Sequence, residues 1–320
     1  MHPPRIWPAL SGMLAAALVA GCGSAKASDT ATPSVSPPIV VAATPAESAT
    51  GLYIAYDEGL FRKAGLKVTI KDTPSVSSAL PLLLHNQVQV IGGQFASFVS
   101  AQAAGAGSFK ILAPGNSLGP RVEEIVVPAG SPITSVPDLE GKTIAVNSLD
   151  SIAQWLSEVI LAAYHIPASR VHFVPVSFPD MGAALAAHRV DAAYLIEPYL
   201  TQSEEQYGAV ALADADAGPA QNLPISAYMA TSAWAKKYPR AAAAFARAIG
   251  QANEIATTNL GEFQEAMERH VGISPKVADI MASGTYPLSV DATQFQRVAD
   301  IMFEYGALKK PISVKGMILN

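Results

Sequence analysis

The stretch that decides the fold is residues 39–68, IVVAATPAESATGLYIAYDEGLFRKAGLKV. Its first five residues, 39–43, form a short apolar run of the kind that makes a buried strand. Residues 52–61 carry apolar side chains at helical spacing, and Gly65 can end that helix because glycine adopts the left-handed conformation without strain. Residues 66–70 then read as a second strand. This order predicts two parallel strands joined by a helix.

The alternation of strands and helices continues through the rest of the chain. Further strands are expected at residues 88–91, 109–112, 124–127, 143–146, 171–176, 192–196 and 223–229, and further helices at 77–84, 152–163, 181–187, 239–258, 260–270, 275–282 and 292–306. We therefore expect an α/β protein of two lobes, each a mostly parallel sheet flanked by helices, with a helical C-terminal part. The first lobe would span residues 39–127 and the second 128–224. Residues 225–320 would return to the first lobe and supply the C-terminal helices.

The first 38 residues have the composition of an export signal followed by a linker. Residues 1–21 carry one positive side chain, Arg5, and then an interrupted apolar segment that is shorter than the roughly 20 residues of a membrane span. Cys22, the only cysteine, follows directly after small residues, as an acylated cysteine does. Residues 22–38 are rich in Ser, Thr, Pro and Ala, which predicts a lipidated N-terminus on a flexible linker. A plain signal peptide with an incidental cysteine is the alternative.

Composition excludes several classes of protein. Half of the 320 residues are hydrophobic and 15% are charged, which excludes a disordered chain. The formal net charge is −5 and no basic block occurs, so we expect no nucleic-acid partner. A single cysteine leaves no intrachain disulfide and no cysteine-based zinc site, and the six histidines show no metal-binding spacing. No metal and no cofactor are expected.

The loops that follow the strands supply a candidate ligand site. In open α/β sheets, ligands bind beyond the carboxyl ends of the strands, and helices that begin there offer free N–H groups. The candidate ligand-binding residues are Glu47, Ser48, Ser75, Gln94, Phe95, Asn147, Ser148, Ser151, Ser177 and Glu197. For several of the polar ones, among them Asn147, Ser148 and Ser151, an ordinary helix N-cap is the alternative role.

The charge and aromatic content of these loops bears on the ligand. They contain four carboxyl groups and no Lys or Arg, which favours a neutral or amine-bearing ligand over a strongly anionic one. Aromatic residues near the loops offer a flat stacking surface, and the candidates are Phe95, Trp155, Phe178, Tyr194 and Tyr199.

One pattern of catalytic type occurs in the chain. Residues 115–119, GNSLG, match the G-x-S-x-G pattern of serine hydrolases. That motif needs a helix immediately after the serine, but Pro120 and a strand-like segment follow here. We interpret these residues as a glycine-rich turn and assign no catalytic residue.

Three stretches, taken in order, resemble a known family. Residues 51–68 are similar to the P-L-Y-x-A-x-x-x-G-x-F-x-x-x-G-L-x-V stretch of the nitrate/sulfonate/taurine type of ABC-transporter substrate-binding proteins. Residues 136–146, VPDLEGKTIAV, resemble its D-L-K-G-K-x-V-A-V stretch, and residues 191–199, DAAYLIEPY, its D-A-x-x-x-x-E-P segment. The group also includes proteins that bind thiamine-pyrimidine precursors, and Cys22 fits its lipoprotein branch. Gly51 stands where the family commonly has proline, so we carry over no particular substrate.

The resemblance implies a periplasmic-binding-protein-like fold of type II and the role of an extracytoplasmic, monomeric solute-binding component of an ABC importer. A sulfonate-like or pyrimidine-like organic nutrient would be captured between the lobes by hinge closure, without catalysis, and passed to a permease and its ATPase. The hinge is expected near residues 124–127 and 223–229, and lipidated Cys22 would anchor the protein to the bacterial cell membrane. Two alternatives stay open: a pyrimidine-synthase-like enzyme of the same fold, and a ligand-sensing lipoprotein not linked to transport.

Overall fold

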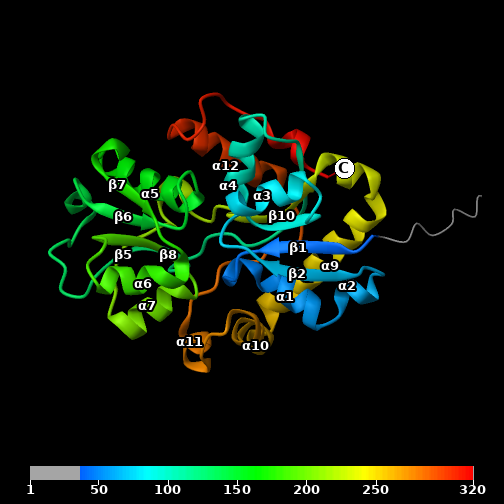
Figure 1. Ribbon diagram of the computed structural model, residues 1–320, viewed down its shortest axis with the longest axis horizontal. Coiled ribbons are helices and arrows are strands. Elements are labelled where there is room, and N and C mark those ends of the chain that lie inside the picture. The colour runs from blue at the N-terminus through cyan, green and yellow to red at the C-terminus, as the bar shows by residue number, and fades with distance from the viewer. Residues whose placement is uncertain (1–36, 320) are drawn as a thin grey trace, which may run out of the picture. The chain divides into compact units, whose positions relative to one another are not determined.

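The computed structural model describes residues 37–319, so the predicted export signal, Cys22 and most of the linker lie outside the described residues. The described chain forms two five-stranded sheets, each flanked by helices (Figure 1). The α/β fold of two lobes that the sequence predicts is therefore confirmed. No helix among residues 37–319 has the length and apolar character needed to cross a membrane.

The first sheet has the strand order β2-β1-β3-β10-β4. Its strands are β1 (Ile39–Ala43), β2 (Val68–Asp72), β3 (Val90–Gln94), β4 (Phe109–Pro114) and β10 (Ser226–Thr231). Strand β1 is parallel to both β2 and β3, whereas β10 runs antiparallel to its neighbours β3 and β4. Strands β1, β3 and β4 are buried along most of their length and are largely apolar, whereas three of the five residues of the edge strand β2 are exposed.

Helices cover both faces of the first sheet (Figure 1). They are α1 (Thr50–Asp57), α2 (Leu60–Lys63), α3 (Val76–Leu84), α4 (Phe95–Ala103), α8 (Ser232–Lys237), α9 (Pro239–Thr258), α10 (Leu260–Val271), α11 (Pro275–Ile280) and α12 (Ala292–Glu304). Alternate strand residues divide between the two faces, because side chains along a strand point in opposite directions. Ala42 and Ile91 pack in the core that includes α3, α4 and α12. Val41 and Val90 pack in the core that includes α1, α9 and α10.

The second sheet has the order β7-β6-β8-β5-β9. It consists of β5 (Glu123–Val127), β6 (Thr143–Val146), β7 (His172–Pro175), β8 (Ala192–Ile196) and β9 (Val210–Asp214), with helices α5 (Ile152–Ala163), α6 (Phe178–Ala186) and α7 (Tyr199–Tyr207). Strand β6 is parallel to β7 and β8, and β5 runs antiparallel to β8 and β9. The chain also has short 3-10 turns, η1 (Glu47–Ala49), η2 (Val136–Leu139), η3 (Ala168–Arg170), η4 (Gly218–Ala220) and η5 (Val314–Met317).

One strand belongs to a different lobe from the one that the sequence predicts. Residues 123–127 form β5, which pairs with β8 and β9 of the second sheet and not with any strand of the first. A first lobe that runs to residue 127 is therefore wrong at that boundary. The hinge expected near residues 124–127 and 223–229 stays a prediction. The segments that pass between the sheets lie just before β5 and just before β10.

Three chain segments meet between the two sheets, and we call this region the waist. Residues 115–118 run antiparallel to 223–226, with the Leu118 N–H donating to the Leu223 carbonyl at 2.9 Å. The third segment, residues 281–286, we call the strap; Ser117 and Thr285 exchange two backbone hydrogen bonds of 2.9 and 3.3 Å. A Cβ on Gly284 would lie 2.3 Å from the Ser117 carbonyl oxygen, so this close approach requires glycine.

Candidate functional site

A hollow of about 230 Å³ lies where loops from the two sheets face each other, and we call it the cleft hollow. Its lining residues are Thr44, Pro45, Asp72, Thr73 and Pro74 at the ends of β1 and β2, and Ser177, Phe178, Pro179 and Tyr199 after β7 and β8. The sequence predicted a site at these carboxyl ends. The Phe178 and Tyr199 rings lie nearly parallel, at 11° and 5.9 Å between centroids. The Tyr199 hydroxyl donates to the Pro45 carbonyl at 2.7 Å and so ties the two lobes together.

A second hollow of about 240 Å³ lies between α4, the N-terminal half of α5 and the end of α12. Ser151 lines it, but its hydroxyl accepts from the Gln154 N–H at 3.4 Å and so caps α5. The same hollow is lined by Trp155, whose indole N–H is buried without a partner, and by Glu158, whose pKa is raised by burial. For Ser151 the capping role, left open by the sequence, is therefore seen.

Glu47 is fully buried and bonded to its own chain. Its carboxylate accepts from Asn116 Nδ2 at 2.5 Å, from the Gly284 N–H at 3.0 Å and from the Tyr286 hydroxyl. Burial raises the pKa of Glu47 to about 7, although these donors act in the opposite direction. The side chain that the sequence offered to a ligand instead holds the strap against the first lobe.

Glu197, in the second lobe, also holds the strap through hydrogen bonds to its carboxylate. Its carboxylate accepts from the Thr201 hydroxyl at 2.7 Å, the Thr201 N–H at 3.2 Å and the Ala282 N–H at 3.0 Å. Burial raises its pKa to about 7. The Glu47 N–H also donates to the Glu197 carbonyl at 3.2 Å, so the two residues join the lobes directly. Neither Glu47 nor Glu197 lines the cleft hollow.

A third buried glutamate lies at the start of β5. Glu123 accepts from the Tyr194 hydroxyl at 2.5 Å, and this is its one side-chain hydrogen bond among the described residues. Burial raises the pKa of Glu123 to about 8, and the nearby Glu47 carboxyl adds to the effect. Tyr194, a candidate stacking residue, is therefore a core partner of Glu123 and does not face a ligand.

The remaining predicted site residues divide among three environments. Phe95 is wholly buried and packs edge-on against Phe295 at 4.7 Å, so it belongs to the core. The Ser75 hydroxyl caps α3 by accepting from the Ser78 N–H at 3.2 Å. Ser177 lines the cleft hollow and donates to Asp180. Ser48 is half-buried in η1, and Gln94 is the half-buried last residue of β3, directly before α4.

Asn147 and Ser148, at the end of β6, keep polar atoms without partners. The Asn147 Oδ1 and Ser148 Oγ atoms are buried and make no hydrogen bond within the described chain. A buried polar atom without a partner costs about 1–3 kcal/mol. These two atoms therefore remain candidates for contact with a ligand.

Sequence reasoning missed Asp72. The apolar pattern ends the predicted strand at residue 70, yet β2 runs on to Asp72 and brings its side chain to the cleft hollow. Only the register of β2 against β1, with Asp72 opposite Ala43, places the carboxylate beside the site.

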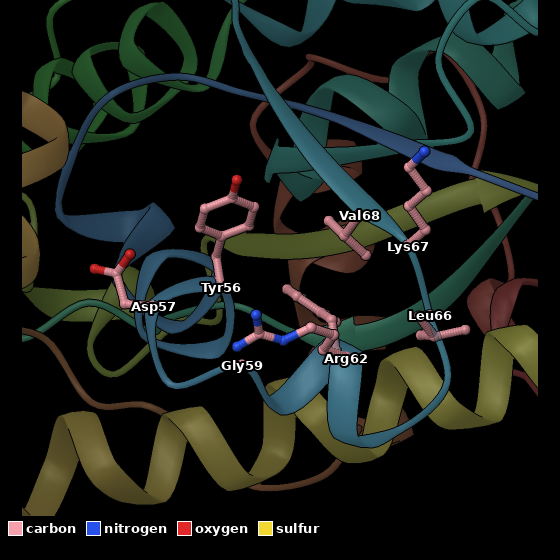
Figure 2. A pocket seen from close by; sticks show the side chains of 8 residues that line it. Tyr56, Asp57, Gly59, Arg62, Leu66, Lys67 and Val68 are labelled. Carbon is pink, nitrogen blue, oxygen red and sulfur yellow. The ribbon is translucent and has the colours of Figure 1, made fainter.

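A larger pocket of about 360 Å³ lies in the first lobe, around the turn from α1 to α2 (Figure 2). Figure 2 shows the Arg62 guanidinium turned back toward Gly59, with Tyr56 and Asp57 on the α1 side. The Asp57 carboxylate is already bonded to Arg269 at 2.5 Å and to His270 at 3.0 Å. All the residues that line this pocket belong to the first lobe, whereas both lobes contribute residues to the cleft hollow. We therefore place the candidate site in the cleft hollow.

Residues 37–319 contain no group of three or more His, Cys, Asp or Glu side chains arranged to hold a metal ion. The groups that line the cleft hollow and can contact a ligand are one carboxylate, several hydroxyl groups and two aromatic rings. This arrangement can bind and orient a small organic molecule through polar contacts and stacking.

Comparisons with known proteins agree with this architecture. The model of the NMT1/THI5-like family matches residues 46–260, about two thirds of the chain. No curated protein matches the sequence.

Among solved structures, the alkanesulfonate-binding protein SsuA from Xanthomonas axonopodis pv. citri, bound to MOPS, is similar with a TM-score of 0.74 at 21% identity. The match covers 88% of this chain and 97% of that one. The periplasmic nitrate-binding protein NrtA from Synechocystis PCC 6803 has a TM-score of 0.69 at 14% identity and coverages of 85% and 82%. The desulfurization enzyme DSZB has a TM-score of 0.64 at 17% identity and coverages of 88% and 96%.

Proposed function

Because the chain belongs to the NMT1/THI5-like family, we propose that it is a solute-binding protein that captures a small organic molecule between its two lobes. The observation that carries this proposal is the cleft hollow, to which both sheets contribute lining residues. A ligand there touches both lobes, so it stabilises the closed arrangement by its additional contacts. Capture of this kind needs no chemical step.

The ligand class follows from the lining residues. No Lys, Arg or His lines the cleft hollow, and one carboxylate does. A sulfonate or nitrate would find no cationic partner there. We therefore favour a neutral or amine-bearing organic molecule over an oxyanion, although two similar solved structures are described as sulfonate- and nitrate-binding proteins.

The partners and the location also belong to this proposal. We propose that the closed protein delivers its ligand to an ABC permease and its ATPase, and that it works outside the cytoplasm. We further propose that acylated Cys22 anchors it, since two or more acyl chains hold a protein stably at a membrane. Cys22→Ser should move the protein from the membrane fraction to the soluble fraction. An unchanged distribution would remove the lipid anchor from the proposal.

Two measurements test capture: the identity of the molecule that the purified protein carries, and closure of the two lobes when ligand is added. Protein purified under native conditions is denatured, and the released molecule is identified by mass spectrometry; a thermal-shift screen with sulfonates, nitrate and pyrimidines extends the search. We expect the ligand to return unaltered and the radius of gyration, measured by X-ray scattering, to fall when ligand is added. Conversion of the ligand would favour an enzyme, a function that DSZB has on this fold.

A pair of variants places the ligand in the cleft hollow. Ser177→Trp should abolish binding because the indole fills a hollow of about 230 Å³. Ser169→Trp is the matched control, since Ser169 is exposed in η3 of the second lobe and does not line the hollow. Equal binding by the two variants would contradict capture at this site.

A further inference from the structure

Asp72 is the only charged side chain among the residues that line the cleft hollow. It is the last residue of β2 and is exposed. No Lys, Arg or His among residues 37–319 forms an ion pair with it, and no described donor hydrogen-bonds its carboxylate. The hollow therefore presents an uncompensated negative charge at its first-lobe wall.

The opposite wall is aromatic. Phe178 and Tyr199 come from the loops after β7 and β8, and their rings are nearly parallel. Tyr199 is held in place by its hydrogen bond to the Pro45 carbonyl. Aromatic faces attract cations as well as flat rings.

We propose that the cleft hollow selects an aryl- or heteroaryl-ammonium ligand, with its cationic N–H groups facing Asp72 and its ring against Phe178 and Tyr199. This inference rests on the proposed function and names the charge class of the ligand. It assigns the charge specificity to one residue of the first lobe, Asp72. An anion in the same hollow would meet the Asp72 carboxylate with no cation to offset it.

The test uses three probes that share a ring and a one-carbon arm: benzylammonium, benzyl alcohol and phenylmethanesulfonate. Isothermal titration of the full chain should give benzylammonium at least a tenfold higher affinity than phenylmethanesulfonate. Asp72→Asn should weaken benzylammonium binding three- to tenfold, a modest factor because solvent screens an exposed carboxylate. The same variant should change benzyl alcohol binding less than twofold.

A control variant separates the charge in the hollow from charge elsewhere in the lobe. Glu58→Gln makes the same charge change as Asp72→Asn at an exposed position in the same lobe, outside the hollow, and should leave all three affinities unchanged. Asp72→Asn should also leave the melting temperature unchanged, which excludes a folding defect as the cause.

Any one of four results would overturn the inference. They are tighter binding of phenylmethanesulfonate, no preference among the probes, no binding of benzylammonium, and an unaltered ammonium preference in the Asp72→Asn variant. These results leave solute capture intact if the Ser177→Trp variant still loses its natural ligand. Failure of both the closure measurement and the Ser177→Trp comparison would instead remove the proposed function.

Discussion

The buried carboxyl groups beside the waist and the carboxyl group of the cleft hollow differ in the hydrogen-bond donors that they meet. Beside the waist, Glu47 and Glu197 each accept three hydrogen bonds from the chain itself, and the buried Glu123 accepts one. In the cleft hollow, Asp72 accepts none from the described residues. The comparison teaches that a carboxyl group in a site loop is free for a ligand only if the protein does not already supply its donors.

The largest difference between the regions should appear in stability. Glu47→Ala leaves the Asn116 amide, the Gly284 N–H and the Tyr286 hydroxyl without their acceptor. We expect the free energy of unfolding in urea to fall by about 4 kcal/mol, because buried groups lose their partners. Asp72→Ala should change it by less than about 0.5 kcal/mol, since Asp72 is exposed. Similar losses in both variants would contradict the contrast.

The pH dependence of stability sharpens the same contrast. Burial raises the pKa values of Glu47 and Glu197 to about 7 and that of Glu123 to about 8. Between pH 4.5 and 8 the folded protein therefore keeps protons that the unfolded chain has released. Stability should be highest at the acidic end of this window and fall as the pH rises through it.

Glu123→Gln tests which group is responsible, because glutamine has the shape of the neutral acid. We expect the decline in unfolding free energy between pH 5 and 8.5 to become shallower in this variant. Asp72→Asn should leave the decline unchanged. A wild-type protein that becomes more stable toward pH 8.5 would show that the buried carboxyl groups are not protonated in the fold.

The strap gives an intermediate effect. Gly284→Ala would bring a Cβ to 2.3 Å from the Ser117 carbonyl oxygen, so the strap must move away from the waist. We expect a loss of about 2 kcal/mol in unfolding free energy and weaker ligand binding. Gly316→Ala is the control, because a Cβ there meets nothing within 4 Å. Equal melting temperatures for the two variants would show that the strap tolerates displacement.

The smallest effect is expected at the edge of the waist. Lys276 of α11 pairs with Glu205 of α7, and both side chains are partly exposed. Exposed ion pairs contribute little, so Lys276→Ala should change the unfolding free energy by less than about 0.5 kcal/mol. Thermal unfolding at low and high salt measures this. A larger loss would make α11 a main link between the lobes.

Much of the fold could be predicted from local pattern, because buried strands appear in the sequence as short apolar runs and amphipathic helices as apolar residues at helical spacing. Strand β9 was missed since residues 210–214 lie half-exposed at a sheet edge and carry no buried apolar run. The lobe to which β5 belongs could not be predicted, because the residues of a strand do not specify which other strands it pairs with. The loops that line the cleft hollow were predicted from the rule that ligands bind beyond the carboxyl ends of the strands.

The roles of individual site residues were harder to predict. Glu47 and Glu197 stand in the predicted loops, but each also accepts from a strap residue far away in the chain, Gly284 for Glu47 and Ala282 for Glu197. No local pattern reports a contact of that range. Ser75 and Ser151 took the capping role that their position before a helix allows. Asp72 needed the register of β2 to appear beside the cleft hollow.

The most direct test of the account is a crystal structure of the protein with benzylammonium, or with the ligand that it carries from the cell. We predict an unaltered ligand in the cleft hollow, with its charged group toward Asp72 and its ring against Phe178 and Tyr199, while Glu47 and Glu197 keep their hydrogen bonds to the strap. A ligand bonded to Glu47 or Glu197, a ligand outside the cleft hollow, or a chemically altered molecule would contradict it.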